Sequence, residues 1–379
     1  MPGNRIYGRL RYWAFAAVTA GISLAVLLLA VEIGFRLRGT EPSLQPLFTD
    51  DPVIGYRPRP RAEMTFTTTE FSTKIRINSA GFRDDEIGAK PAGEHRVVVL
   101  GDSMVMAIQV PLEMTFVKRL EAGLRRATSA TRYRVINAGV QGYGTVEEWL
   151  LFERTVDLLQ PDVVVVAVMV GNDAVESADS SWRMEPRKPR SHLQSTGSTA
   201  SLLARRLARR SEVIQFLRQR LFTAASPTRA VPLRQRPLDS YVDPVPAEVR
   251  EGFQISARCV ERIADLARSR GAPTAVALLP ARFQLDDQDF ANLQHTMSAP
   301  NRAFVRDAAT DRYRAALAVG SVPVLDLLPV FQREPRPAEL YFRQNVHLTT
   351  RGHQVVAGAL ARFLHDERIV PAPVERGEQ

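Results

Sequence analysis

Short runs of valine, isoleucine and leucine recur along the chain and alternate with segments whose apolar residues have helical spacing. The runs predict strands at residues 97–100, 134–137, 163–169, 274–279 and 322–326. Each run is continuous, so both faces of its strand must be buried, and this requires helices on both sides of a parallel sheet. We therefore expect a three-layer, doubly wound α/β domain over residues 91–370. In such domains the ligand site forms where loops leave the carboxyl ends of the strands.

The N-terminal region has a different pattern. Residues 12–31 contain no charged side chain and are dense in alanine, valine and leucine. A helix of this length would cover about 30 Å of hydrocarbon, so the segment predicts one membrane span after a basic tail at residues 1–11. A cleaved signal peptide is the alternative, although its apolar core would normally be shorter, about 7 to 15 residues. Arginines lie on both sides of the segment, and their distribution only slightly favours an N-terminus inside the cell.

A stretch rich in proline, threonine and arginine follows at residues 40–90. Its alternating pattern over residues 64–77 predicts one or two strands, and residues 78–83 have the composition of a turn. We expect this stretch to form a collar that packs on the main domain.

A long insertion separates the third and fourth predicted strands. Residues 181–240 hold thirteen Lys or Arg against three Asp or Glu, whereas the whole chain has a net charge of +9. The basic character therefore belongs to this insertion. Apolar residues on one helical face predict an amphipathic basic helix within it, at Leu203, Leu207, Ile214, Leu217 and Leu221. This helix could be solvated, form a lid over the site, or rest on anionic lipid or polysaccharide.

The composition excludes several classes of protein. With 45% hydrophobic and 24% charged residues, the chain is expected to fold around a core, which excludes wholesale disorder, collagen and a multi-pass membrane protein. The single cysteine, Cys259, excludes an intramolecular disulfide framework and a thiolate metal cluster. No histidine pair has the spacing of a metal site, and the insertion lacks the interleaved aromatic residues typical of nucleic-acid binding. We expect no metal, no other cofactor and no nucleic-acid partner.

Polar residues and glycines follow three successive predicted strands. Ser103 comes directly after the first strand and a Gly-Asp pair, where an α/β enzyme presents a nucleophile. The second strand ends in a glycine-rich loop that begins at Gly139, and the third runs into Asn172. Each feature alone has a simpler explanation as a capped or tight turn. Together with His347, which precedes the last predicted helix, they could supply a nucleophile, a base and donors for an oxyanion.

These four blocks resemble the SGNH (GDSL-type) hydrolase superfamily, over roughly residues 78–364 and especially its bacterial membrane-anchored members. The resemblance implies a flavodoxin-like three-layer sandwich with a parallel sheet and no metal. It also implies that Ser103 is the nucleophile and His347 the base. The Ser103 N–H, Gly139 and Asn172 would form the oxyanion hole. Known members are esterases, lipases, carbohydrate deacetylases and polysaccharide O-acetyltransferases.

The sequence departs from the family pattern at the acid of the catalytic triad. The family normally places an aspartate two or three residues before the histidine, and here Asn345 and Gln344 occupy those positions. An Asp-to-Asn exchange in a serine protease lowers turnover about 10⁴-fold because it favours the wrong imidazole tautomer. Asn345 could nevertheless orient His347, the two residues Ser103 and His347 could act as a dyad, or Asp326 at the end of the fifth strand could reach the ring.

Other polar residues near these motifs have structural explanations. His353 lies at the start of the last predicted helix, where capping or packing is more common than catalysis. Asp102 and Asp173 are expected to hold their loops by accepting backbone N–H bonds.

The leading hypothesis is a membrane-anchored serine acyl-ester hydrolase or O-acyltransferase. It would act outside the cytoplasm, from a single span in a bacterial inner membrane, on an O-acylated carbohydrate or another small ester. The alternative is a weakly active or inactive module of the same fold that binds glycan or envelope partners, which the missing triad acid favours. The sequence indicates neither the substrate nor the oligomeric state.

Overall fold

The computed structural model describes residues 43–128, 131–180 and 236–371, and positions 13, 15–16, 18–24, 26–27 and 29–33 of the N-terminal region. The chain forms two units, one of Met1–Pro42 with Pro189–Ala230 and one of Ser43–Lys188 with Val231–Gln379. In the first unit, the described positions are helical and carry exposed apolar side chains such as Phe15, Ile22 and Leu29. No helix among the described residues is both long enough and apolar enough to cross a membrane. The membrane span expected at residues 12–31 is therefore not supported, and the predicted basic helix around Leu203–Leu221 lies outside the described residues.

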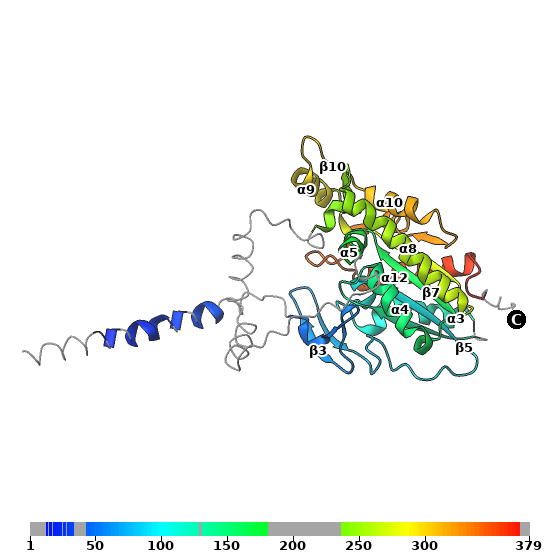
Figure 1. Ribbon diagram of the computed structural model, residues 1–379, viewed down its shortest axis with the longest axis horizontal. Coiled ribbons are helices and arrows are strands. Elements are labelled where there is room, and N and C mark those ends of the chain that lie inside the picture. Colours follow the sequence, from blue (N-terminus) through cyan, green and yellow to red (C-terminus); the bar gives the residue numbers. More distant parts are fainter. Residues whose placement is uncertain are drawn as a thin grey trace, which may run out of the picture. The chain divides into compact units, whose positions relative to one another are not determined.

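A parallel sheet of five strands forms the centre of the second unit (Figure 1). In chain order these strands are β5 (Glu94–Gly101), β6 (Arg132–Gly139), β7 (Val163–Met169), β9 (Thr274–Leu279) and β11 (Val324–Asp326). Across the sheet they lie in the order β11-β9-β7-β5-β6. The second strand is thus at one edge and the first lies between the second and the third, which is the flavodoxin-like arrangement. The predicted parallel sheet is confirmed, and β7 and β9 have the predicted bounds.

Helices cover both faces of the sheet. Successive residues of a strand therefore pack into different hydrophobic clusters. In β5, Val98 and Leu100 pack toward one cluster, while Val97 and Val99 pack toward the other. The first cluster includes residues of α4 (Thr145–Leu159), α5 (Asp173–Ser180), α8 (Ala247–Ser269) and α10 (Ala308–Leu317). The second includes residues of α2 (Ser103–Met106), α3 (Phe116–Ala127), α11 (Leu328–Gln332) and α12 (Thr350–Asp366). This arrangement gives the predicted three layers.

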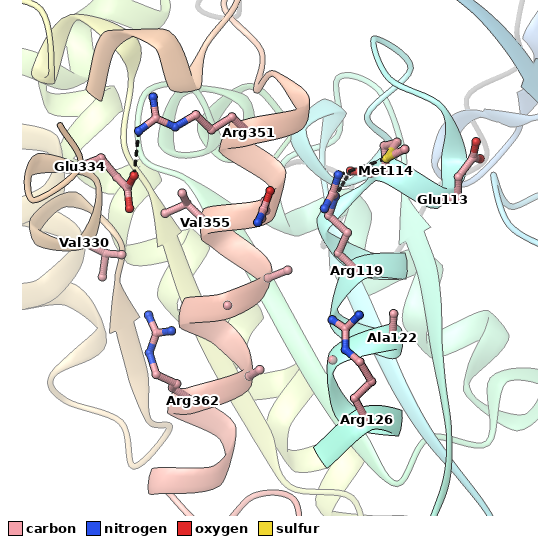
Figure 2. Close-up of a pocket in the computed structure, with 15 residues that line it drawn as sticks. Glu113, Met114, Arg119, Ala122, Arg126, Val330, Glu334, Arg351, Val355 and Arg362 are labelled. Carbon is pink, nitrogen blue, oxygen red and sulfur yellow. Dashed lines mark hydrogen bonds and ion pairs between the residues drawn. The ribbon is translucent and has the colours of Figure 1, made fainter. Parts of the chain in front are cut away.

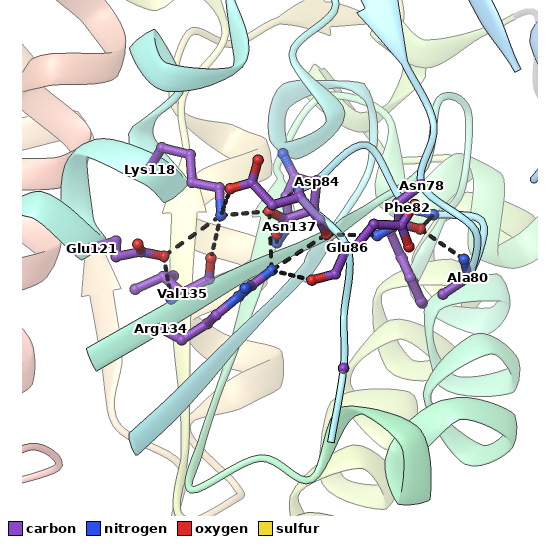
Figure 3. A network of polar contacts seen from close by, with 12 residues as sticks. Asn78, Ala80, Phe82, Asp84, Glu86, Lys118, Glu121, Arg134, Val135 and Asn137 are labelled. Carbon is purple, nitrogen blue, oxygen red and sulfur yellow. Dashed lines mark hydrogen bonds and ion pairs between the residues drawn. The ribbon is translucent and has the colours of Figure 1, made fainter. Parts of the chain in front are cut away.

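Side chains satisfy backbone groups along β6, the edge strand next to β5. The Asn137 N–H donates to Asp84 Oδ2 at 2.7 Å, and the Val135 N–H donates to Glu121 Oε2 at 2.8 Å. The Lys118 ammonium contacts the buried Asp84 carboxylate and donates to the Val135 carbonyl, as Figure 3 shows. Because edge N–H groups otherwise invite pairing with another chain, these contacts protect the edge of the sheet.

Two hairpins precede the sheet. β1 (Phe48–Asp51) pairs with β2 (Gly55–Pro58), and β3 (Glu63–Thr67) pairs with β4 (Ser72–Arg76). The β3–β4 hairpin spans residues 63–76, which nearly coincides with the predicted alternating segment 64–77. Its Phe66 and Ile75 form a small hydrophobic cluster with Met106 and Ile108, at and just beyond the end of α2. The hairpin is thereby packed on the element that begins with Ser103.

The remaining elements are short or connect the layers. They are η1 (Gln45–Leu47), η2 (Leu112–Met114), η5 (Pro237–Tyr241), β8 (Val242–Asp243), η6 (Arg282–Gln284), α9 (Asp287–Met297), β10 (Ala303–Phe304) and η7 (Pro337–Leu340). β8 and β10 pair with each other antiparallel.

Candidate active site

Ser103 lies at the carboxyl edge of the sheet, where β5 ends and α2 begins. The turn requires a glycine at position 101, because a Cβ there would lie 2.2 Å from Val105 Cγ2 and 2.9 Å from the Ala167 carbonyl oxygen. Asp102 caps α2, since its side chain accepts the Met104 N–H at 2.8 Å. Ser103 follows the first strand of the sheet and Asn172 follows the third. These strands are neighbours at the point where the strand order reverses, which is where ligands bind in open α/β sheets.

His347 lies beside Ser103 although the two residues are 244 positions apart. It belongs to the loop between η7 and α12, and its Nε2 is 2.8 Å from Ser103 Oγ. Its Nδ1 is 2.6 Å from Asn345 Oδ1. Because a carbonyl oxygen can only accept, this contact places the proton on Nδ1 and leaves the Nε2 lone pair directed at the serine hydroxyl. Asn345 therefore selects the imidazole tautomer that a general base requires.

The environment of His347 favours the neutral imidazole. Burial lowers the pKa of His347 to about 4, so the ring is uncharged at pH 7. Asp326 is not a partner of the ring, because both ring nitrogens contact other residues, while the Asp326 carboxylate accepts the Leu328 N–H at 2.8 Å and pairs with Arg314. The suggestion that Asp326 orients His347 is therefore wrong, and the ring partner is the amide of Asn345.

A pocket of about 550 Å³ opens over the serine and the histidine. Its apolar wall comes from β7, η5, η6 and α9 and from the loop before α12. The residues of this wall are Met169, Leu238, Tyr241, Phe283, Leu293 and Val346. Its polar lining includes Asn172 near the serine, and Arg282, Asp289 and Asn292 from η6 and α9. The pocket can therefore accept a molecule that combines an apolar group with hydroxyl or amide groups.

Asn172, a predicted oxyanion donor, has acceptors within the chain. Its Nδ2 donates to Asp102 Oδ2 at 3.2 Å and to Glu176 Oε2 at 3.0 Å. The Ser103 N–H also forms a hydrogen bond with the Asp102 carboxylate. Both donors lie at the pocket, and their role toward a substrate oxygen stays a prediction.

Gly139 is placed differently from what the sequence led us to expect. Its N–H donates to Asn137 Oδ1 at 3.1 Å, and it does not line the pocket around Ser103. A Cβ at this position would lie 2.4 Å from the Met106 backbone nitrogen and 2.5 Å from Val105 Cβ. These contacts show that the absence of a side chain lets α2 pack against the end of β6, and they lend no support to a role as an oxyanion donor.

Five buried carboxyl groups lie in and behind the site, where sequence reasoning had singled out only Asp102 and Asp173. The other three, Glu147, Glu148 and Glu176, lie on helices α4 and α5. Burial, with the other acids adding to it, raises the pKa of Glu148 and of Asp173 well above the usual range. Acidic residues in the first turns of helices are typical of exposed caps, so the sequence held no signal of their burial.

The two aspartates hold backbone groups as the sequence suggested. Asp102 accepts from Met104, and Asp173 Oδ2 accepts the Met169 N–H at 2.9 Å. His353 also has the expected packing role. Its Nδ1 accepts the Phe116 N–H at 3.2 Å, and burial lowers its pKa to about 3.

A larger cavity of about 870 Å³ lies between α3 and α12 (Figure 2). Arginines from both helices border it, including Arg119, Arg126, Arg351 and Arg362, and two of its other lining residues are glutamates. None of the described residues that line it is a serine, cysteine or histidine. Because Ser103 and His347 line the smaller pocket, that pocket is the candidate active site.

Comparison with known proteins agrees with this geometry. The model of the "GDSL-like Lipase/Acylhydrolase family" matches residues 99–355, a range that includes Ser103, Asn172 and His347. No curated protein matches the chain at a significant level. No group of histidine, cysteine, aspartate and glutamate side chains within the described ranges is arranged to hold a metal ion.

Several solved structures resemble the chain at low identity. The lipase/acylhydrolase from Enterococcus faecalis is 14% identical over 74% of this chain and 100% of its own, with a TM-score of 0.40. An α/β hydrolase from the metagenome of Lake Arreo, Spain, is 17% identical over 71% of this chain and 94% of its own, with a TM-score of 0.39. A two-domain esterase active on acetylated mannans is 13% identical over 75% of this chain and 54% of its own, with a TM-score of 0.39.

Proposed function

Because the chain belongs to the GDSL-like lipase/acylhydrolase family, we propose that it is a serine esterase that forms an acyl-enzyme on Ser103. The observation that carries the proposal is the 2.8 Å contact between His347 Nε2 and Ser103 Oγ at the pocket. A nucleophile and a base within hydrogen-bond reach, with the base oriented by a third group, form the arrangement that acyl transfer requires.

The reaction would begin with attack of Ser103 Oγ on the ester carbonyl carbon. His347 Nε2 would take the hydroxyl proton as the new C–O bond forms. The same proton would then pass to the leaving alcohol as the original ester bond breaks. Asn345 Oδ1 would hold the Nδ1–H throughout, which keeps the ring in one tautomer and orientation. A second acceptor hydroxyl, activated in the same way, would release the acyl group from the serine.

The negative charge on the ester oxygen requires donors in the tetrahedral intermediate. The Ser103 N–H and Asn172 Nδ2 are the candidates at the pocket, and each would exchange its bond to Asp102 for a bond to the substrate oxygen. Burial raises the pKa of Asp102, while its hydrogen bonds to Met104, Asn172 and Ser103 lower it.

The test is turnover by the purified full chain in detergent. We expect hydrolysis of p-nitrophenyl acetate by the wild type and a fall of at least about 10³-fold in kcat for Ser103→Ala. Folding of the variant is checked by circular dichroism. Equal rates for the wild type and a folded S103A protein would overturn the proposal.

The substrate we propose is an O-acylated carbohydrate or another small ester. The apolar wall suits the acyl group, and the polar lining from η6 and α9 suits the hydroxyl groups of a sugar. Water or a sugar hydroxyl could receive the acyl group. Incubation with an acetylated oligosaccharide and an unacetylated acceptor, followed by mass spectrometry, distinguishes free acetate from acetylated acceptor.

One observation favours a second candidate, a weakly active or inactive module that binds glycan or envelope partners. The ring of His347 faces an amide where the family normally has a carboxylate. The variant Asn345→Asp separates the two candidates. If the remaining machinery is assembled, we expect kcat to rise by about tenfold or more. No change in a folded N345D protein, together with an inactive wild type, would favour binding alone.

We also propose that the protein is attached to a bacterial inner membrane and that its main unit lies outside the cytoplasm. The support is the run of uncharged residues at 12–31 in the sequence. Membrane fractionation of the full chain, with carbonate extraction and protease accessibility in spheroplasts, tests this. Recovery in the soluble cytoplasmic fraction would contradict it.

A further inference from the structure

The tip of the β3–β4 hairpin reaches the loop that carries the proposed base. Glu70 lies at this tip, outside the family-matched residues 99–355. Its carboxylate accepts the Arg343 N–H at 2.8 Å, the Gln344 N–H at 3.0 Å and the Asn345 N–H at 2.7 Å. One side chain thus binds three successive backbone amides from a segment about 275 residues away.

These bonds satisfy backbone N–H groups that have no partner in a helix or a strand. Residues 343–345 are bends and belong to no helix or strand. Successive N–H groups that converge on one anion form a strong and directional site, because hydrogen bonds to a charged acceptor are about twice as strong as neutral ones. Glu70 therefore fixes the path of the backbone through Asn345.

The hairpin tip is itself fixed. Thr68 Oγ1 accepts the N–H groups of Glu70 and Phe71, each at 3.2 Å, and the Thr68 N–H donates to the Phe71 carbonyl at 2.8 Å. The Phe71 ring lies 5.2 Å from the Phe342 ring and 5.8 Å from the Phe66 ring. These aromatic contacts join the tip both to the hairpin and to the loop.

The loop is also held from the main domain. Arg282 Nη1 donates to the Arg343 carbonyl at 2.9 Å, while Glu70 accepts from the N–H of the same residue. Tyr341, at the start of the loop, donates its hydroxyl to the Pro280 carbonyl. The segment before His347 is therefore clamped between the hairpin on one side and the region around η6 on the other.

We propose that Glu70 is a positioning residue that holds Asn345 and His347 in register with Ser103. The inference rests on the proposed function. Asn345 is the link, because its backbone N–H contacts Glu70 and its side chain contacts His347 Nδ1 at 2.6 Å. A neutral amide attracts the Nδ1–H less strongly than a carboxylate would, so the orientation of the ring depends more on where the backbone places that amide.

The experiment compares Glu70→Ala and Glu70→Gln with Thr69→Ala in the full chain. Thr69 is the matched control, because it lies at the same tip, and its side-chain hydrogen bond within the described residues goes to the Gln344 side chain, at 3.2 Å, and not to the loop backbone. For E70A we expect kcat to fall about ten- to hundredfold with KM nearly unchanged, since misplacement of a catalytic group affects the transition state most. E70Q retains a carbonyl acceptor, so we expect a smaller fall in kcat. T69A should resemble the wild type.

Two further measurements make each outcome decisive. Denaturant midpoints report global folding, and the rate of Ser103 labelling by a fluorophosphonate reports the serine–histidine pair without turnover. Wild-type kcat and wild-type labelling in E70A would overturn the inference, as would an equal loss in T69A. If E70A does not fold, the E70Q variant is the test, and an unchanged kcat with an unchanged labelling rate in E70Q would overturn the inference. An inactive and unlabelled wild type would instead overturn the proposed function.

Discussion

His347 determines how the site responds to pH. Its ring is half-buried at the pocket, and its lowered pKa of about 4 keeps it neutral over a wider range than an exposed histidine, whose pKa is about 6.5. Asn345 fixes the tautomer without adding a charge. The site therefore has its base in the active form from weakly acidic pH upward.

The first prediction concerns the acid limb of the activity profile. The pH dependence of kcat/KM reports the pKa of the base in the free enzyme. We expect the rate to fall only as the pH drops toward about 4, where His347 takes up a proton and can no longer accept one from Ser103. Initial rates between pH 3.5 and 8 measure this. An acid limb centred near 6.5 would contradict the described environment of the ring.

The second prediction concerns Asn345→Asp. A carboxylate in place of the amide, which lies 2.6 Å from His347 Nδ1, stabilises the protonated ring and raises its pKa. The acid limb should therefore move to higher pH, even though kcat itself is expected to rise. The same series of rates checks it. An unmoved limb would mean that the new carboxylate does not face the ring.

Among single residues, those that follow a predicted strand or belong to a known motif could be predicted as site residues from the sequence, such as Ser103, Asn172 and His347. The sequence also suggested Asn345 as the group next to the base. The family resemblance gave Gly139 a donor role, whereas the packing against Met106 shows a close approach of the backbone there, which the sequence does not indicate. Glu70 carried no signal, because a glutamate in a hairpin turn is usually solvated.

Among the elements, α2 depends most on contacts from outside the sheet. Arg83 is 1% exposed, and its guanidinium donates to the Met106 carbonyl at 2.7 Å and to the Val110 carbonyl at 2.6 Å, with a further bond to Ala107. Burial lowers the pKa of Arg83 to about 10, which still leaves it charged at pH 7. This arginine satisfies the carbonyl groups at the end of the helix that begins with Ser103.

The third prediction is that Arg83→Met destabilises the fold by about 3 kcal/mol, because it leaves buried carbonyl groups without a donor. Arg83→Lys should recover only part of the loss, since an ammonium cannot reproduce the planar fork. Arg132 is exposed, and Arg132→Met serves as the control, expected within about 0.5 kcal/mol of the wild type. Urea denaturation measures all three, and equal midpoints for R83M and R132M would contradict the role of Arg83.

Strands that are continuous apolar runs could be predicted from sequence, as for β7 and β9. β11 is shorter than predicted, because Pro323 precedes Val324 and its own residues are only half-buried at the edge of the sheet. The alternation of the 64–77 segment predicted one or two strands. Its division into β3 and β4 and its contact with the loop at 343–345 depend on tertiary packing.

At the scale of the whole molecule, the buried acids link the site to stability. Burial raises the pKa of Glu148 well above its usual range, and the nearby Asp102, Glu147 and Glu176 raise it further. The folded state therefore keeps a proton that the unfolded chain releases above about pH 4.5. The stabilisation that this proton contributes to the folded state is fully present below about pH 4.5, and it is lost as the pH rises toward the pKa of Glu148 in the folded state.

The fourth prediction follows for Glu148→Gln, which keeps the size of the side chain and cannot ionise. We expect a denaturant midpoint close to that of the wild type at pH 5 and a higher midpoint at pH 9. Glu153→Gln, at an exposed position on the same helix, should change neither value. A difference between E148Q and the wild type that is the same at both pH values would show that ionisation is not its cause.

The layers of the molecule could be predicted because their signal is local, in the period and continuity of apolar residues. The position of the collar could not, since it depends on contacts between segments far apart in the chain, such as Phe71 with Phe342.

The most direct test of the account is the mass of the protein after reaction with a fluorophosphonate. The account predicts a single adduct on the peptide that contains Ser103, formed by the folded wild type at neutral pH and strongly slowed in His347→Gln, because the contact at 2.8 Å activates the hydroxyl. Absence of an adduct on Ser103 in folded protein, or labelling at the same rate in H347Q, would contradict it.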